Sequence, residues 1–264
     1  MAFGFDRRGG RFGEPRHALK WFMATPSGVL RAAPDLQNFI QNLTDANAEE
    51  IQEYTAEIVS EKEFYKHLEG NRSNFGGRPF LSWGRGIGTT LGTVLYALCR
   101  KLKPDAVVET GVASGVSSAY ILCALEQNKH GKLYSIDLPW GETMTYPKHY
   151  FAPEGAGRVM PRREQSGWII PDYLRHRWQL VPGRSSEKLP PLLEKLGTID
   201  IFLHDSEHSY QNMLWEYQTA WAYLKGGGIL LSHNVDDNDA FSHFCESVRV
   251  KGFLLANMGG AVKA

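Results

Sequence analysis

Hydrophobic and polar positions alternate in two ways along the chain, and the change from one to the other predicts its elements. Short apolar runs with the length of buried strands lie at 106–108, 133–136, 178–181, 199–203 and 229–231. Apolar residues recur at helical spacing over 117–127, 187–196, 207–224 and 238–248. Strands and helices that alternate in this way predict a mostly parallel sheet with helices on both faces.

The residues on either side of this region follow a less regular pattern. Residues 1–45 carry scattered aromatic residues without a sustained period, and the chain starts as a flexible, glycine-rich arm. Amphipathic helices are predicted over residues 46–68 and 91–102, the second ending in cations that suit the helix dipole. From Phe253 we expect a closing hairpin around Gly259 and Gly260.

These patterns divide the chain into two regions and one insertion. We expect an N-terminal arm and helical cap over residues 1–84, followed by the main domain over residues 85–264. Within that domain, residues 140–177 are crowded with proline, glycine, aromatic residues and arginine. A loop of this length is usually functional or disordered, and its aromatic content disfavours disorder. We expect a lid or substrate wall, with a dimer-contact insertion as the alternative.

Composition and charge exclude several classes of protein. The chain of 264 residues has 29 basic and 29 acidic side chains, so no charge imbalance indicates nucleic acid or a membrane as partner. Cys99, Cys123 and Cys245 lie in apolar helical patterns, which indicates buried thiols in a reducing compartment. The sequence contains no apolar run of about 18 residues, so we expect no membrane-spanning helix. The N-terminus lacks the apolar core of a secretion signal. We expect a cytoplasmic homo-oligomer, a dimer, that acts on a small molecule.

The stretch from residue 106 to 139 combines a strand, a glycine-containing turn, a helix and a second strand. Its turn reads ETGVASG, and Gly111 and Gly115 permit backbone conformations and close approaches that a Cβ would block. One of Ser114, Ser117 and Ser118 is expected to cap the helix. In such a unit, a nucleotide-like ligand binds beyond the carboxyl ends of the strands.

Two cofactor classes compete for this turn. Dinucleotide enzymes carry G-x-G-x-x-G after the strand, whereas this chain has Gly111, Ala113 and Gly115, with Glu109 ending the strand. A pyrophosphate prefers bare backbone amides, so the carboxylate instead favours a cofactor that carries an ammonium group. Asp137, at the end of the next strand, is placed to accept hydrogen bonds from two ribose hydroxyls.

These residues resemble the first two motifs of class I S-adenosylmethionine-dependent methyltransferases. The resemblance covers about residues 85–250 and implies a doubly wound, mostly parallel, seven-stranded α/β sheet. The segment over 166–221, which begins SGWIIPDYL and ends EYQTAW, looks like a bacterial branch of methyltransferases that act on small molecules of the natural-product type.

The resemblance implies S-adenosylmethionine as the cofactor. Gly111, Ala113 and Gly115 would then flank its methionyl part, and Asp137 would hold its ribose. The complete set of residues that we expect to bind the cofactor is Glu109, Gly111, Ala113, Gly115, Ser117, Asp137, Ser185 and Asp205.

Polar side chains follow the fourth and fifth strands of the predicted sheet. Asp205 and His208 come after the fourth strand, and His233 and Asn234 after the fifth. Because neighbouring parallel strands end at the same edge, these side chains should converge near the transferable methyl group. We expect His208 to be the base, since imidazole titrates near neutral pH, with Asp205 and His233 as further catalytic residues.

Two neighbours of Asp205 are assigned other roles. His204 should point to the opposite side of its strand, outside the site. Ser206 is expected to cap the helix that begins at residue 207.

In the metal-dependent O-methyltransferases that the sequence resembles, an aspartate after strand four and an acidic pair after strand five bind Mg²⁺. The chain departs from this pattern at His233 and Asn234, and imidazole suits softer ions than Mg²⁺. Three possibilities stay open. Asp205, His233 and Asn234 bind a softer divalent ion such as Mn, Fe, Ni or Zn; Mg²⁺ binds weakly through Asp236 or Asp237; or no metal binds and a histidine is the only base.

The sequence therefore predicts a methyltransferase that uses S-adenosylmethionine, with O-methylation of a small-molecule or natural-product hydroxyl as the leading reaction, with or without a metal. The alternatives are an N- or C-methyltransferase without metal, an NAD-binding oxidoreductase, and a non-catalytic protein that keeps the fold.

Overall fold

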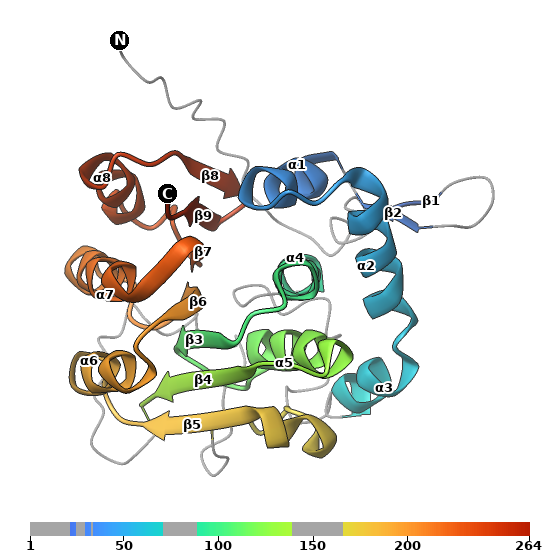
Figure 1. Cartoon of the computed structure of the whole chain (residues 1–264). Helices are drawn as coiled ribbons and strands as arrows, with labels where there is room; N and C mark the ends of the chain where they lie inside the picture. Colours follow the sequence, from blue (N-terminus) through green and yellow to red (C-terminus); the bar gives the residue numbers. More distant parts are fainter. Residues whose placement is uncertain (1–21, 25–29, 33, 71–88, 139–165) are drawn as a thin grey trace, which may run out of the picture.

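A computed structural model describes residues 22–24, 30–32, 34–70, 89–138 and 166–264. Its centre is a seven-stranded sheet with helices on both faces (Figure 1), with strand order β5-β4-β3-β6-β7-β9-β8. The strands are β3 (Ala106–Thr110), β4 (Lys132–Asp137), β5 (Trp178–Pro182), β6 (Ile199–His204), β7 (Leu224–Ser232), β8 (Gly252–Leu255) and β9 (Met258–Val262). Strands β3 to β7 are parallel, and β9 joins β7 and β8 antiparallel. This confirms the predicted doubly wound, mostly parallel α/β sheet.

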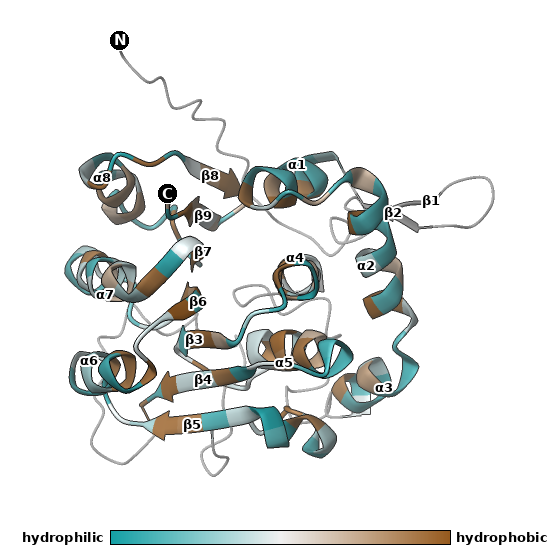
Figure 2. Cartoon of the chain, in the orientation of Figure 1, coloured by the Kyte–Doolittle hydropathy of each residue, from teal (hydrophilic) through white to brown (hydrophobic). Residues whose placement is uncertain are grey.

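The two faces of the sheet bury separate hydrophobic clusters because successive side chains of a strand point to opposite faces. In β6, Ile201 and Leu203 face one cluster and Phe202 faces the other. Figure 2 shows brown, hydrophobic stretches on strands β3 to β7. The first cluster packs under α1 (Pro34–Leu43), α2 (Ala48–Ser60), α3 (Lys62–Gly70), α4 (Thr89–Leu102) and α5 (Val116–Asn128). The second packs under α6 (Ser185–Leu196), α7 (Tyr210–Tyr223) and α8 (Ala240–Ser247).

The structure corrects the prediction for the N-terminal region. Residues 34–43 form α1, with Leu36, Phe39, Ile40 and Leu43 buried. The helix has only 10 residues, so its apolar period does not stand out from the scattered aromatic residues around it. A two-stranded sheet of β1 (Phe22–Ala24) and β2 (Leu30–Ala32) precedes it.

The helix predicted over residues 46–68 is two helices. Asn47 and Glu50 form a capping box that starts α2. Glu61, with ψ of 77°, leaves the helical conformation and separates α2 from α3. Helix α4 matches its predicted range and carries Arg100 and Lys101 in its last turn, as expected.

Two predicted helix caps are wrong. Helix α7 starts at Tyr210, where Ser209 is the cap and accepts a hydrogen bond from the backbone of Asn212, so Ser206 does not cap it. Helix α5 has Gly115 at its cap position, without any side-chain cap. Ser117 and Ser118 instead donate hydrogen bonds to the buried carboxylate of Glu109.

The closing hairpin exists, but its turn lies at Ala256 and Asn257, between β8 and β9. Gly259 and Gly260 lie inside β9, where a Cβ would come within 2.7 Å of Phe241 and of Leu43, respectively. These glycines therefore serve close packing and not the turn.

The predicted lid falls partly outside the described residues, which omit 139–165. Its last part, residues 166–177, packs into the first cluster through Ile169, Ile170 and Leu174 and includes the 3₁₀ helix η5 (Asp172–Arg177). Helices α1 to α3 share that same cluster with α4 and α5. The division into a cap and a main domain stays a prediction.

Cys99, Cys123 and Cys245 are buried and free, as expected. Among the described helices, none combines the length and the apolar composition needed to cross a membrane.

Candidate active site

The glycine turn after β3 is held against the end of β6. Thr110 accepts a hydrogen bond of 2.9 Å from the backbone of Asp205. Gly111 has φ of +84°, and a Cβ there would lie 2.0 Å from the carbonyl oxygen of Asp205. Gly115 has φ of +93°, and its Cβ would lie 2.8 Å from Gly167. At both positions a Cβ would collide with the neighbouring backbone, so only glycine fits. This holds independently of any ligand that the turn binds.

Glu109 is the second-last residue of β3 and is fully buried. Its carboxylate accepts hydrogen bonds from Ser117 at 2.5 Å, Ser118 at 2.6 Å and Ser135 at 2.9 Å. Burial raises the pKa of Glu109 to about 7, although the three hydroxyls act to lower it. The carboxylate thus ties the strand to α5 and β4, and its expected contact with the cofactor, like that of Ser117, stays a prediction.

Asp137 ends β4 beside the glycine turn, and only one of its two carboxylate oxygens accepts a direct hydrogen bond from the described residues. Its Oδ1 accepts a hydrogen bond of 3.1 Å from the backbone of Val112. Its Oδ2 is buried and makes no direct hydrogen bond in the described part of the chain. Burial raises the pKa of the carboxyl, although the nearby hydroxyl of Ser166 and backbone amides act to lower it. A buried acceptor without a donor costs free energy, so this oxygen fits a ligand that brings hydroxyl donors, as a ribose does.

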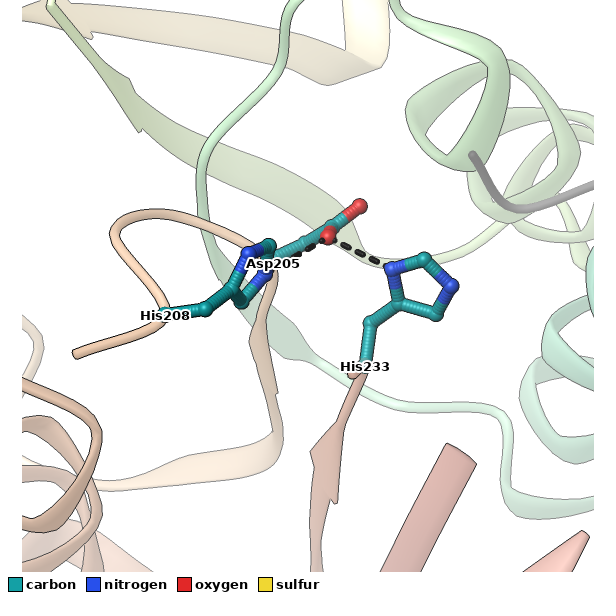
Figure 3. A group of neighbouring side chains, drawn as sticks. All are labelled: Asp205, His208 and His233. Atoms are coloured by element: carbon teal, nitrogen blue, oxygen red, sulfur yellow. Dashed lines mark hydrogen bonds and ion pairs between the residues drawn. The ribbon is translucent and has the colours of Figure 1, made fainter. Parts of the chain in front are cut away.

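Asp205, His208 and His233 meet at the carboxyl edge of β6 and β7 (Figure 3). Asp205 Oδ1 lies 2.8 Å from Nδ1 of His233 and 3.4 Å from Nε2 of His208. The donor atoms of all three lie within 4.8 Å of one another. The parallel strand ends therefore bring these residues together as expected, and their catalytic roles stay predictions.

The carboxylate of Asp205 and the imidazole of His233 each stabilise the charged form of the other. Burial acts to raise the pKa of Asp205, but the imidazoles of His233 and His208 outweigh it and hold that pKa well below its usual range. For His233, burial acts to lower the pKa, but the carboxylate of Asp205 outweighs it and raises it. Asp205 is therefore an ionised acceptor toward which both imidazoles can direct an N–H group.

Asn257 was missed by sequence reasoning. It lies in the turn between β8 and β9, and its side-chain Nδ2 is 2.9 Å from Nε2 of His233. Its carbonyl accepts a hydrogen bond of 3.1 Å from the backbone of Val235. An asparagine in a hairpin turn is ordinary turn chemistry, so nothing in the sequence marked it.

Asn234 follows His233 with a left-handed φ of +55°, which asparagine tolerates better than most residues. Its amide Nδ2 donates to Asp237 at 3.2 Å, and its Oδ1 is buried without a partner among the described residues.

This donor set does not fit Mg²⁺. Mg²⁺ prefers oxygen ligands, whereas the cluster offers one carboxylate and two imidazoles. Imidazole nitrogens suit zinc, iron or nickel better, but Nδ1 of His233 is engaged with Asp205 and Nε2 with Asn257.

A second polar cluster adjoins the first at the end of β6, where the rings of His204 and His208 are in contact. His204 Nδ1 is 2.7 Å from the carboxylate of Glu216, and both side chains are fully buried. Thr110 and Ser206 donate to the same carboxylate at 2.5 and 2.7 Å. The ring centroid of His204 nevertheless lies only 5.5 Å from that of His208, in an edge-on contact. His204 therefore adjoins the proposed base, contrary to the expectation that it lies outside the site.

Ser185, expected to bind the cofactor, belongs to this second cluster in the structure. It begins α6, and its hydroxyl is among the groups that lower the pKa of Glu216 against the effect of burial, after His204. Its contact with the cofactor stays a prediction.

The comparisons with known proteins agree with this geometry. Residues 108–235, just under half of the chain, match the model of the methyltransferase domain family. No curated protein matches the sequence. A candidate O-methyltransferase from Klebsiella pneumoniae is similar in structure, with a TM-score of 0.51 and 17% identity over 78% of this chain and 91% of that one.

The O-methyltransferase TomG from Streptomyces achromogenes, which is involved in tomaymycin synthesis and was solved with S-adenosylmethionine, is equally similar. Its TM-score is 0.51, with 16% identity over 78% of this chain and 91% of that one. At these identities the two likenesses establish the fold. Together with the match of residues 108–235 to a methyltransferase domain, they show that this chain has the fold of these methyltransferase structures.

Proposed function

We propose that this protein transfers the methyl group of S-adenosylmethionine to a hydroxyl of a small molecule. The observation that carries the proposal is the pair Asp205 and His208, an ionised carboxylate beside an imidazole at the carboxyl edge of the sheet. The open Oδ2 of Asp137 supports a cofactor with ribose hydroxyls. Oxygen as the acceptor is supported by the two solved structures of similar fold, both described as O-methyltransferases.

In this reaction His208 is the general base. Because Asp205 is ionised, it favours the tautomer in which Nε2–H of His208 points at the carboxylate, which leaves the lone pair on Nδ1. That nitrogen takes the proton of the substrate hydroxyl while the oxygen attacks the methyl carbon. The bond from carbon to sulfur breaks, its electron pair stays on sulfur, and Asp205 stabilises the imidazolium that forms.

The 3.4 Å separation of Nε2 and Asp205 is long for a hydrogen bond. Catalytic hydrogen bonds often tighten only when substrate is bound, so this distance is compatible with the role. The cofactor supplies the reactive methyl group, and the protein supplies alignment and proton acceptance.

Substitution of His208 tests the proposal. In a screen of hydroxyl-bearing metabolites with isotopically labelled S-adenosylmethionine, the wild type should label a hydroxyl. His208→Ala should lower turnover by about 10²–10⁴-fold, while calorimetry shows nearly unchanged cofactor affinity. His130→Ala is the matched control, because His130 is a half-exposed imidazole that contacts Asp105, away from the cluster. Full activity of His208→Ala would contradict the assignment of the base.

Two further measurements separate the alternatives. Titration with NAD should show no binding, and product analysis should place the methyl group on oxygen and not on nitrogen or carbon. Activity should persist in EDTA. If EDTA abolishes it and Zn, Fe, Mn or Ni restores it, the cluster of Asp205, His208 and His233 is a metal centre and His208 is not a free base.

A further inference from the structure

His233 uses both of its ring nitrogens on partners from different elements. Nδ1 is 2.8 Å from Asp205 in the loop after β6, and Nε2 is 2.9 Å from Asn257 in the β8–β9 turn. The side chain is 2% exposed. A buried imidazole with one partner on each nitrogen has a fixed ring orientation and a tautomer set by those partners.

We propose that Asn257 is a positioning residue of the active site, which acts through His233 to hold the carboxylate of Asp205 in place for His208. The side-chain amide of Asn257 donates to Nε2, so the ring proton of neutral His233 resides on Nδ1. That N–H group donates to Asp205 Oδ1, the same oxygen that faces His208. Asn257 itself is not assigned a contact with substrate or cofactor.

The fold fixes Asn257 independently of its side chain. Its carbonyl accepts a hydrogen bond from the backbone of Val235, two residues after His233. Strand β9, which follows it, pairs with β7 so that Gly259 lies opposite Ser232. The turn and the end of β7 are therefore tied together on both sides of the contact between Asn257 and His233.

Without the amide of Asn257, only the carboxylate of Asp205 favours the proton on Nδ1 of His233, and a larger fraction of the neutral rings carries the proton on Nε2. A nitrogen lone pair would then face the ionised carboxylate of Asp205, and this repulsion would displace the carboxylate from His208. The inference rests on the proposed function only for its effect on turnover, because the tautomer of His233 can be measured without any substrate.

Two substitutions with opposite chemistry test this role. In Asn257→Ala no group fixes Nε2, and we expect the Nδ1-protonated form of His233 to lose population and turnover to fall about five- to tenfold. In Asn257→Asp the new carboxylate accepts from Nε2–H, so both nitrogens are protonated while Nδ1–H still donates to Asp205. That variant should keep most of the wild-type turnover.

The first readout is a ¹⁵N–¹H correlation spectrum of the histidine rings at one fixed pH, with His233→Asn to assign the signals. Leu254→Ala, on an exposed position of the same hairpin, is the control for general effects on the hairpin and should match the wild type in spectrum and turnover. Calorimetry should show equal cofactor affinity in all variants.

Unchanged His233 signals in both Asn257 variants would overturn the inference. So would an Asn257→Ala variant in which the Nε2-protonated form of His233 gains population but turnover stays at the wild-type value. If Asn257→Ala does not fold, the spectrum of Asn257→Asp still tests the inference, because both ring nitrogens of His233 should be protonated in that variant. If the wild type transfers no methyl group at all, the proposed function fails while the spectra still test the hydrogen-bond relation.

Discussion

Three carboxylates near the ends of neighbouring strands differ in state because their neighbours differ. Glu109 is enclosed by three serine hydroxyls, and burial dominates, so its pKa rises to about 7. Asp205 is half-buried, and because two imidazoles face it, its pKa falls. Asp137 keeps one oxygen without a donor. The first carboxylate thus supports the turn, the second orients the proposed base, and the third is open to ligand.

The raised pKa of Glu109 predicts a pH-dependent cost to stability. With a pKa of about 7 when folded and 4.5 when unfolded, the folded state binds more protons between these values, so the free energy of unfolding falls as pH rises through this range. Glu109→Gln cannot ionise and should lack this loss, which is about 3 kcal/mol at most.

Urea unfolding of both proteins at pH 5 and pH 8 measures this effect. The wild type should lose stability relative to Glu109→Gln at the higher pH. Glu63→Gln, on the exposed side of α3, is the control and should follow the wild type at both values. A constant difference between wild type and Glu109→Gln would mean that the buried carboxyl does not titrate in this range.

At the scale of elements, helix α7 contributes more than an apolar face to the sheet. Its Glu216 accepts hydrogen bonds from Thr110 at the end of β3 and from Ser206 in the loop after β6, and it pairs with His204. The loop after β6 also carries Asp205 and His208. One buried side chain of α7 therefore connects the ends of two strands beneath the proposed catalytic residues.

Removal of this carboxylate should be strongly destabilising. Glu216→Ala leaves His204 and two hydroxyls buried without an acceptor, and the loss of one partner of a buried pair typically costs about 3–5 kcal/mol. Urea unfolding at constant pH measures it. Gln211→Ala, on the exposed side of α7, should change the free energy of unfolding by less than about 0.5 kcal/mol. An equally small effect of Glu216→Ala would show that the network contributes little.

At the scale of the whole molecule, the strand order places the proposed cofactor and acceptor sites side by side. Strand β3 pairs with β4 on one side and β6 on the other, so Asp137 and Asp205 flank the glycine turn. Parallel sheets bind ligands beyond the carboxyl ends of the strands where the order reverses. A ligand that bridges this edge should stabilise the folded protein.

S-adenosylhomocysteine at about 100 times its Kd should therefore add about 2.7 kcal/mol to the free energy of unfolding and raise Tm. Asp137→Ala should weaken binding by about 1–3 kcal/mol, because it removes the acceptor for the ribose hydroxyls, and should reduce the gain in Tm at the same ligand concentration. Asp172→Ala, with a fully exposed carboxylate in η5, is the matched control. Equal gains in Asp137→Ala and wild type would contradict the ribose assignment.

The sequence by itself determined strands β3 to β7, most of the helices and the type of the main sheet, but neither α1 nor the small sheet of β1 and β2. Periodicity reports which residues must be buried, and for β3 to β7 the apolar runs are too short for helices and too continuous for exposed strands. The position of Asp205, His208 and His233 at one edge also followed from the sequence, since parallel strands end together.

Only the tertiary structure decided which partner each polar side chain takes. Ser117 and Ser118 could have capped α5, but Glu109, eight and nine residues away in sequence, is the nearer charged acceptor in the folded core. Glu216 and Asn257 lie in a helix and a turn that any polar residue could occupy, and their partners are 12 and 24 residues away. Hydrogen bonds act over about 3 Å in space, so local sequence patterns, which describe neighbours along the chain, carry no information about them.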